Sequence, residues 1–260
     1  MTQIREVIRQ LEAWAPPDWA ESYDTVGLLW GEPDRSVSAI LTALDISPAI
    51  LQEAQALSAN LVITHHPIWF GQKQRLLWDS FADRMIYDFI RAEVAVYAMH
   101  TNLDHAKEGV SFVLCRALGL KPESFLKNEG GDHGAGYVGV GPTALPVEDF
   151  LKHVQQTLGI PALRYARGPQ TSIQRVAVCG GAGSFLLPEA LKMGVDAFLT
   201  ADIPYHRFFE AQGRLWLIDI GHYESEVRIA DHIAAYLQQS FPTLPIFSTR
   251  IRTSPIEYWI

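Results

Sequence analysis

Short apolar stretches alternate with longer stretches of helical periodicity along most of the chain. Strands are predicted at residues 39–44, 61–63 and 94–98, and helices at residues 48–57 and 80–92 lie between them. Strands that alternate with helices predict a parallel sheet covered by helices. The first half of the sequence therefore indicates an α/β fold.

The second half repeats this alternation. Strands are predicted at 137–140, 175–179, 197–200 and 215–218, and helices at 147–158, 188–193, 205–212 and about 225–239. Further helices are predicted at 3–14, with Thr2 as a possible N-cap, and at 110–118. The sequence predicts two similar α/β halves with mixed, largely parallel sheets.

A change in composition marks the expected boundary between the halves. Residues 121–142 hold six of the 19 glycines and two prolines, which is typical of a linking segment. We therefore expect one α/β half at residues 1–125 and another at 126–260. The sequence leaves open whether the C-terminal segment packs back on the first half.

Composition and charge narrow the class of protein. Of the 260 residues, 48% are apolar and 19% are charged, which is enough apolar material for a packed core. The net charge of −8 argues against non-specific binding to nucleic acid or to an anionic membrane. A nucleotide is not excluded, because a metal can supply the positive charge that a phosphate needs.

Cysteine usage and hydropathy indicate a cytoplasmic location. Cys115 and Cys179 lie in apolar surroundings and are expected to be free thiols in a reducing compartment. No apolar run reaches the roughly 18 residues of a membrane span. The N-terminal stretch is charged at every turn and lacks the apolar region of a signal peptide.

Three predicted strands run directly into residues that bind metals well. His65 and His66 follow the first of these strands, His100 and Asp104 the second, and His222 and Glu226 the third. Ligands collect outside the carboxyl ends of strands in α/β sheets. A spacing of four residues places both members of the last two pairs on one face of a helix. The alternative is a set of unrelated polar loops.

The types of side chain indicate which metals they would bind. Imidazole together with carboxylate suits Zn, Mn, Fe or Co, and disfavours calcium or a pure magnesium cage. The number of donors exceeds the needs of one catalytic metal. Two divalent cations that share a bridging carboxylate account for the count better.

The same motifs resemble a known family. T-H-H-P-I-W-F-G at 64–71, H-T-N-L-D at 100–104 and G-H-Y-E-S-E at 221–226 are similar to motifs of the Nif-three-like family, often labelled GTP cyclohydrolase 1 type 2 homologues. D-T-V-G-L-L-W-G at 24–31, L-T-A-L-D-I-S at 41–47 and F-L-T-A-D-I-P-Y-H-R at 198–207 support the resemblance in the family's order. The chain resembles the short members, which lack an extra domain inserted mid-chain.

The resemblance implies a dinuclear metal centre at the strand ends, between the two halves. Its implied ligands are His65, His66, Asp104, His222 and Glu226. Asp104 and Glu226 would be the bridges, and His100 would lie near the metals without being a first ligand. A toroidal homohexamer with the sites facing an internal cavity is also implied.

Two residues depart from the family's pattern. Thr25 stands where an asparagine is usual, and His105 stands where a small residue is common. Neither belongs to the implied ligand set. A histidine at position 105 would alter the mouth of the site.

Several further residues have two interpretations. Asp45 and Asp202 end strands, where they would act as caps or structural residues, or as partners of metal ligands. His206 would reach the site or serve packing. The loop G-G-A-G-S-F at 180–185 would form a tight turn or hold an anion, although it lacks the full dinucleotide fingerprint. Solvated or satisfied side chains are expected for His133, His153 and His232, and packing or interface roles for Trp69, Phe70 and Trp78, with a substrate-pocket wall as the alternative.

The predicted function is that of a metal-dependent hydrolase that uses a metal-activated water, with His100 shuttling a proton. The family label suggests GTP as substrate, but no guanine-reading element is visible, and phosphoester or amide hydrolysis fits the metals equally well. The alternatives are a non-enzymatic metal-binding or regulatory scaffold and a pure interaction module. A coordination shell with no open position would favour the scaffold.

Overall fold

The computed structural model describes residues 1–71 and 75–259, which form two compact units. The first unit contains Met1–Leu103 together with Ile229–Pro255. The second contains Asp104–Arg228 and the chain that follows Pro255. Each unit has its own sheet and its own core, as an α/β protein with two similar halves requires.

The sheet of the first unit has five strands in the order β1-β4-β3-β2-β11. These are β1 (Gly27–Trp30), β2 (Ile40–Ala43), β3 (Leu61–Thr64), β4 (Ala95–Ala98) and β11 (Ile246–Ser248). All neighbours pair in parallel except β1, which runs antiparallel to β4 at one edge. The residues of β2, β3 and β4 are all buried, as in parallel sheets covered on both faces.

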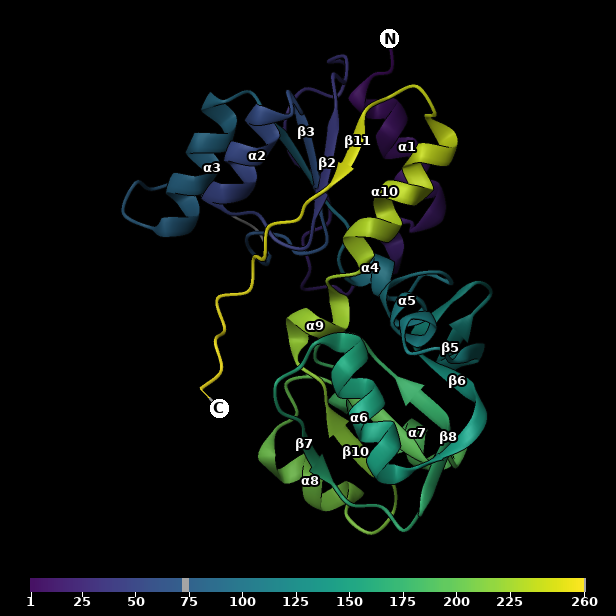
Figure 1. Cartoon of the computed structure of the whole chain (residues 1–260). Helices are drawn as coiled ribbons and strands as arrows, with labels where there is room; N and C mark the ends of the chain where they lie inside the picture. The colour runs from purple at the N-terminus through teal and green to yellow at the C-terminus, as the bar shows by residue number, and fades with distance from the viewer. Residues whose placement is uncertain (72–74, 260) are drawn as a thin grey trace. The chain divides into compact units, whose positions relative to one another are not determined.

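Helices cover both faces of this sheet. In Figure 1, α2 (Pro48–Ala56) and α3 (Phe81–Arg91) lie on one side of its strands, and α1 (Ile4–Trp14) and α10 (Ile229–Ser240) on the other. Ser47 and Ser80 cap α2 and α3, since their side chains accept from the backbone amides three residues later. The N-cap of α1 is Gln3 and not Thr2, because the Glu6 carboxylate accepts from the Gln3 amide. A short helix, η1 (Pro17–Trp19), follows α1.

The sheet of the second unit has six strands in the order β5-β6-β8-β9-β10-β7. These are β5 (Lys121–Gly130), β6 (His133–Pro146), β7 (Arg164–Ala166), β8 (Ser172–Val178), β9 (Ala197–Thr200) and β10 (Trp216–Asp219). The central strands β8, β9 and β10 are parallel, and the outer pairings are antiparallel. The carboxyl ends of the parallel strands therefore share one edge of this sheet.

Two layers of helices enclose this second sheet. Its helices are α5 (Val110–Ala117), α6 (Val147–Leu158), α7 (Leu187–Met193), α8 (Tyr205–Ala211) and α9 (His222–Glu226), with the short η2 (Ser184–Leu186) before α7. One core cluster joins α5 and α6 to the sheet through Cys115 and Phe150. Another joins α7 and α8 to its other face through Leu187 and Ala211.

The units divide the chain at Leu103 and Asp104, and not near residue 125. The glycine-rich stretch 121–142 is no linker, because it lies almost entirely in the paired strands β5 and β6. Its glycines allow close packing: a Cβ at Gly139 would collide with the sulfur of Cys115 on α5. Helix α5 therefore belongs with the second sheet. The C-terminal elements α10 and β11 return to the first unit, as the sequence had left open.

The helix predicted at about 225–239 is in fact two helices, α9 and α10, separated by Val227 and Arg228. No glycine or proline marks the break. The Arg228 guanidinium donates to the carbonyl of Thr157 at 2.5 Å and to that of Glu224 at 3.4 Å. These tertiary hydrogen bonds accompany the interruption that local propensity does not predict.

In the described part of the chain, none of the helices is both long enough and apolar enough to cross a bilayer.

Candidate metal centre

Three histidines of the first unit lie together at the carboxyl ends of β3 and β4. His65 and His66 follow β3 directly, and His100 is two residues beyond β4. Their ligand atoms lie within 4.8 Å of one another, and their ring centroids are 5.0 to 5.4 Å apart. This spacing allows one ion to contact several imidazoles. The sequence prediction that histidines gather at these strand ends is confirmed.

The rings of His65 and His66 are held through Nδ1. The Nδ1 of His65 donates to the Met99 carbonyl at 2.7 Å. The Nδ1 of His66 lies 2.7 Å from a carboxylate oxygen of Asp45, whose other oxygen accepts from the Thr253 hydroxyl at 2.6 Å. Metal-binding histidines commonly use such an acceptor, which fixes the ring and directs the other nitrogen to the metal. Asp45 is thus a partner of a candidate ligand.

His100 is held by Asp24, a residue that the sequence did not single out. The Nδ1 of His100 lies 2.9 Å from both carboxylate oxygens of Asp24. Thr101 donates to Asp24 from its amide at 3.0 Å and from its hydroxyl at 2.5 Å. Burial opposes ionisation of Asp24, but the hydrogen bonds from His100 and Thr101 outweigh it and hold its pKa well below the ordinary range. The only sequence signal was its place as the first residue of the motif at 24–31.

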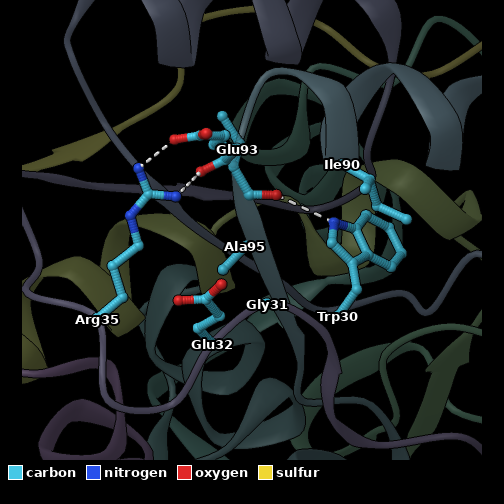
Figure 2. A pocket seen from close by; sticks show the side chains of 8 residues that line it. Trp30, Gly31, Glu32, Arg35, Ile90, Glu93 and Ala95 are labelled. Carbon is cyan, nitrogen blue, oxygen red and sulfur yellow. Dashed lines mark hydrogen bonds and ion pairs between the residues drawn. The ribbon is translucent and has the colours of Figure 1, made fainter.

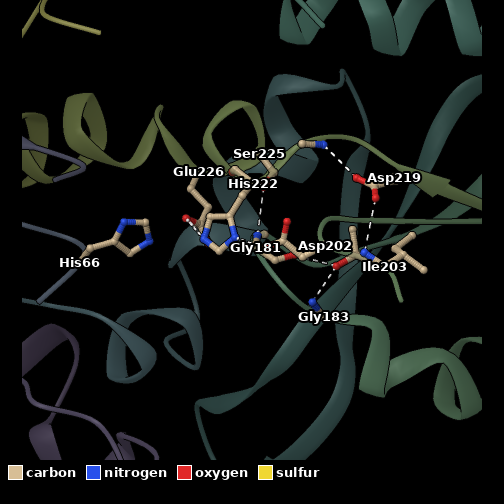
Figure 3. Close-up of polar contacts among 12 residues, drawn as sticks. His66, Gly181, Gly183, Asp202, Ile203, Asp219, His222, Ser225 and Glu226 are labelled. Atoms are coloured by element: carbon tan, nitrogen blue, oxygen red, sulfur yellow. Dashed lines mark hydrogen bonds and ion pairs between the residues drawn. The ribbon is translucent and has the colours of Figure 1, made fainter. Parts of the chain in front are cut away.

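In the second unit, His222 and Glu226 lie one turn apart on α9. The Nε2 of His222 is 3.1 Å from a carboxylate oxygen of Glu226, as the four-residue spacing predicted. The Nδ1 of His222 is 2.6 Å from Asp202, which follows β9 with a φ of 50°. Figure 3 shows this chain of contacts. Asp202 therefore plays the same part toward His222 that Asp45 plays toward His66.

The loop after β8 forms a close-fitting cradle for Glu226. Gly181 has a φ of +59°, and a Cβ there would collide with a carboxylate oxygen of Glu226. The Gly181 amide donates to the Ser225 hydroxyl at 3.0 Å, and that hydroxyl donates to the His222 carbonyl at 2.7 Å (Figure 3). Only a glycine leaves room for the buried Glu226 side chain at this place.

The loop G-G-A-G-S-F at 180–185 forms a tight turn, which was one of the two interpretations of its sequence. The amides of Gly180 and Gly183 donate to the hydroxyls of Ser111 and Thr200, at 3.3 and 2.8 Å. With Gly181 bound to Ser225, these three amides are used within the unit. They are therefore not directed at an anion.

Asp219 fixes the backbone that leads into His222. Its carboxylate forms an ion pair with Arg164 and accepts from the amides of Gly221 at 3.2 Å and Ile203 at 3.4 Å. Figure 3 shows Asp219 between the segments that carry Asp202 and His222. This buried aspartate was also missed, because only the pairing of β9 with β10 reveals its position.

Other candidate residues are placed as follows. Asp104 is half-buried at the end of the short helix α4 (Thr101–Asp104). His105 lies 3.3 Å from Glu129 on β5. A hydrogen bond from Lys127, with the nearby His105 charge, lowers the pKa of Glu129 despite its partial burial. His206 is exposed on α8 and its ring contacts that of Tyr205.

Most of the remaining histidines and aromatic residues contact neighbouring groups, as expected for satisfied or packed side chains. His153 contacts the Leu118 carbonyl at 2.9 Å, and His232 packs against Trp14. Trp69 stacks on Trp30. Phe70 is 60% exposed, and its ring lies 5.7 Å from that of His100, so it can line the approach to the histidines.

The remaining single residues are placed as follows. Trp78 contacts the Tyr87 ring, and His133 lies in β6. Cys115 and Cys179 are free thiols, as predicted. Burial raises the pKa of both to about 12, which makes them poor nucleophiles at neutral pH.

The donor chemistry fits transition-metal ions. Each unit offers imidazole nitrogens whose rings are anchored on the other nitrogen, and the second unit adds the cradled carboxylate of Glu226. Mixed donors of this kind suit Zn, Mn, Fe or Co. The His/Glu groups could therefore hold a metal ion, in keeping with the sequence prediction.

Comparisons with known proteins agree with these features. The sequence profile of one family, Duf34/NIF3 (NGG1p interacting factor 3), matches residues 2–255. A Streptomyces coelicolor protein named "GTP cyclohydrolase 1 type 2 homolog" is 36% identical, over 87% of this chain and 82% of its own. A hypothetical protein from Staphylococcus aureus has a similar crystal structure, with a TM-score of 0.92, 27% identity and 99% of each chain covered. A Bacillus cereus protein related to NIF3 shares the fold, with a TM-score of 0.91 at 22% identity over 100% of this chain and 99% of its own.

Proposed function

Because the chain belongs to the Duf34/NIF3 family, we propose that it binds two divalent cations through His65, His66, Asp104, His222 and Glu226. The observation that carries this proposal is the anchoring of every histidine in the set through Nδ1. Such anchoring is typical of metal-binding histidines. Asp104 and Glu226 are the proposed bridging carboxylates.

Two of the proposed donors of the second unit lie close in sequence to elements of the first. Helix α4 carries the chain from His100 to Asp104 within about one turn. Val227 and Arg228 alone separate Glu226 from the start of α10. Asp104 and Glu226, two donors of the second unit, are therefore close in sequence to elements of the first unit. The third donor, His222, shares helix α9 with Glu226.

The proposed activity is metal-dependent hydrolysis. Bound divalent cations supply Lewis acidity toward a substrate oxygen and make a coordinated water more acidic. His100 would accept or deliver a proton at Nε2, because its Nδ1 is held by Asp24. Phe70 would shield one side of the reacting group from water.

The proposed substrate is a nucleotide or another phosphoester. The Streptomyces coelicolor relative carries a GTP cyclohydrolase homologue's name, and a metal pair can neutralise phosphate charge without basic side chains. The resemblance further supports a toroidal homohexamer, and the two free thiols suit a cytoplasmic location, as parts of the same proposal.

The proposal is tested by measuring metal content with elemental analysis of untagged protein that was purified without chelators. We expect about two transition-metal ions per chain, as in two-metal hydrolases. His65→Ala and Glu226→Ala should lose metal together with hydrolysis of GTP or bis(p-nitrophenyl) phosphate. Glu148→Ala removes an exposed carboxylate of α6 and serves as the matched control. Metal-free wild type that takes up no added metal would refute the site, and metal retention without any hydrolysis would favour the non-enzymatic scaffold.

A further inference from the structure

Several polar groups around one cavity of the first unit already contact one another. A cavity of about 490 Å³ is lined by Trp30, Arg35 and Glu93 among others (Figure 2). Arg35 pairs with the Glu93 carboxylate at 2.6 Å and donates to its carbonyl at 3.0 Å, and the Trp30 indole donates to the Val94 carbonyl at 3.0 Å. These groups satisfy one another, so a ligand would have to displace existing hydrogen bonds.

A smaller cavity in the second unit is different, because its floor is apolar. It has a volume of about 180 Å³ and lies where α5 ends, beside β6, α6 and the start of β8. The apolar lining consists of Leu118, Leu120, Leu145, Phe150 and Ile173. Ile173 is at the opposite end of β8 from the glycine loop that cradles Glu226. The cavity is therefore separate from the candidate metal donors of this unit.

A bulge in β6 builds the mouth of this cavity. Val140 pairs with Arg175 and Leu145 pairs with Ile173, so residues 141–144 leave the ladder opposite the single residue Gln174. Gly141, Pro142 and Thr143 of the bulge form part of the rim, and the Gln174 side-chain amide donates to the Gly141 carbonyl at 3.3 Å. The departure from the ladder leaves a recess above the buried side chains of Leu118, Phe150 and Ile173.

The lining defines the chemical class of a ligand. The cavity is also lined by His153, whose Nε2 contacts the Leu118 carbonyl at 2.9 Å. Of the described residues around this cavity, none is Asp, Glu, Lys or Arg, so a charged molecule would lose hydration without a carboxylate, ammonium or guanidinium partner. The exposed Thr143 and Gln174 provide hydroxyl and amide groups at the rim. A dry engineered cavity of about 150 Å³ lined by Leu, Ile and Phe binds benzene, so a volume of this order accepts one ring.

We propose that this cavity is a binding site for a neutral, single-ring aromatic molecule that carries one hydrogen-bonding substituent. The ring lies beside Leu120 and Leu145, above the buried side chains of Leu118, Phe150 and Ile173. The substituent points to the rim at Thr143 and Gln174. Larger ligands are excluded, because pockets for drug-sized molecules have volumes of about 300 Å³ or more.

The probe for this site is p-cresol, which is neutral at pH 7, and p-toluate is its charged counterpart of similar shape. Methyl-labelled full-length protein is titrated with each probe and followed by NMR. We expect saturable shifts of the Leu118, Leu145 and Ile173 methyls with a Kd of about 1 mM or tighter, and NOEs from the p-cresol ring to these methyls. p-Toluate should bind at least about tenfold more weakly, because its charge must be desolvated.

Two tryptophan variants separate this cavity from general surface binding. Thr143→Trp places an indole at the rim, where it occupies the apolar floor, and should weaken p-cresol binding at least about tenfold. Thr171→Trp introduces the same side chain at an exposed threonine outside the lining and should leave binding unchanged. Absence of saturable NOEs, equal binding by Thr143→Trp, or equal affinity for p-toluate would each overturn the assignment.

Discussion

Residues that bind no metal themselves determine where the candidate ligands point. Asp24, Asp45 and Asp202 each contact the Nδ1 of one histidine, at 2.6 to 2.9 Å. Gly181 determines the position of Glu226 in another way, because its lack of a side chain leaves space for the Glu226 carboxylate. The effect of this glycine can be isolated, because a second glycine of the same unit shares its backbone conformation without its neighbours.

Replacement of Gly181 by alanine should weaken metal binding at least about tenfold, in the range observed when groups that orient metal ligands are removed. The new Cβ would overlap the Glu226 carboxylate and force it from its place. It would also cost about 1–2 kcal/mol of stability, because an L-residue is strained at a φ of +59°. Metal affinity is measured by competition with a chromophoric chelator, and stability by urea unfolding of the metal-free protein.

Gly194→Ala is the matched control for this substitution. Gly194 has a φ of +62°, and a Cβ there would meet nothing within 4 Å. The two variants should lose similar stability without metal, and only Gly181→Ala should lose affinity. Equal metal affinity in both variants would show that Glu226 does not need its cradle.

The sequence predicted the donors better than the groups that hold them. His65, His66, His222 and Glu226 could be found because each follows an apolar strand at a recognisable spacing. Asp24 lies 76 positions before His100, and only the pairing of β1 with β4 brings their segments together. Asp45 and Asp202 were noticed, but a strand-end aspartate equally suits a cap. Tertiary contacts of this kind have no local pattern.

At the scale of elements, composition was misleading in one place. The glycines at 121–142 were interpreted as a flexible boundary, whereas they permit close contact between β6 and its neighbours. Gly134 and Gly139 both lie where a Cβ would collide with β5 or α5. Glycine in a strand can thus mark close approach instead of a turn. The helices predicted at 48–57 and 80–92 agree within one residue at each end with α2 and α3, whose serine caps are local features of the sequence.

The packing of α5 on β6 predicts a specific energetic coupling. Gly139→Ala should destabilise the protein by about 1–3 kcal/mol, since the new methyl group overlaps the sulfur of the buried Cys115. Cys115→Ala removes that sulfur, so the double variant should be more stable than the sum of the two changes by about 1 kcal/mol. Urea unfolding of all four proteins in the metal-free state measures the coupling.

A cysteine elsewhere in the unit provides the comparison for this coupling. Cys179 follows β8 and is not among the atoms that a Cβ at Gly139 would meet. Gly139→Ala combined with Cys179→Ala should therefore be additive within about 0.5 kcal/mol. If the Cys115 pair is equally additive, α5 does not press on β6 at this point.

At the scale of the whole molecule, the proposed ligands are contributed by two compact units, each with its own core. His65 and His66 belong to the first unit, and Asp104, His222 and Glu226 to the second. A cation that binds only the folded protein stabilises each unit that must be folded to supply its ligands. The gain in free energy of unfolding is about 2.7 kcal/mol when the cation concentration is a hundredfold above Kd. One shared pair of metals would therefore stabilise both units together, and two independent sites would stabilise each unit alone.

Hydrogen exchange of the buried strands β2 and β9 reports on the two units separately. Saturating metal should slow exchange in both strands, and its removal by a chelator should speed exchange in both. His66→Ala is the decisive variant, because it alters only the first unit. If the metals are shared, this substitution also weakens the metal-dependent protection of β9, since the shared centre then lacks one of its five proposed ligands. Protection of β9 that persists unchanged in His66→Ala would mean that His222 and Glu226 bind their metal without the first unit, and the common dinuclear centre would have to be abandoned.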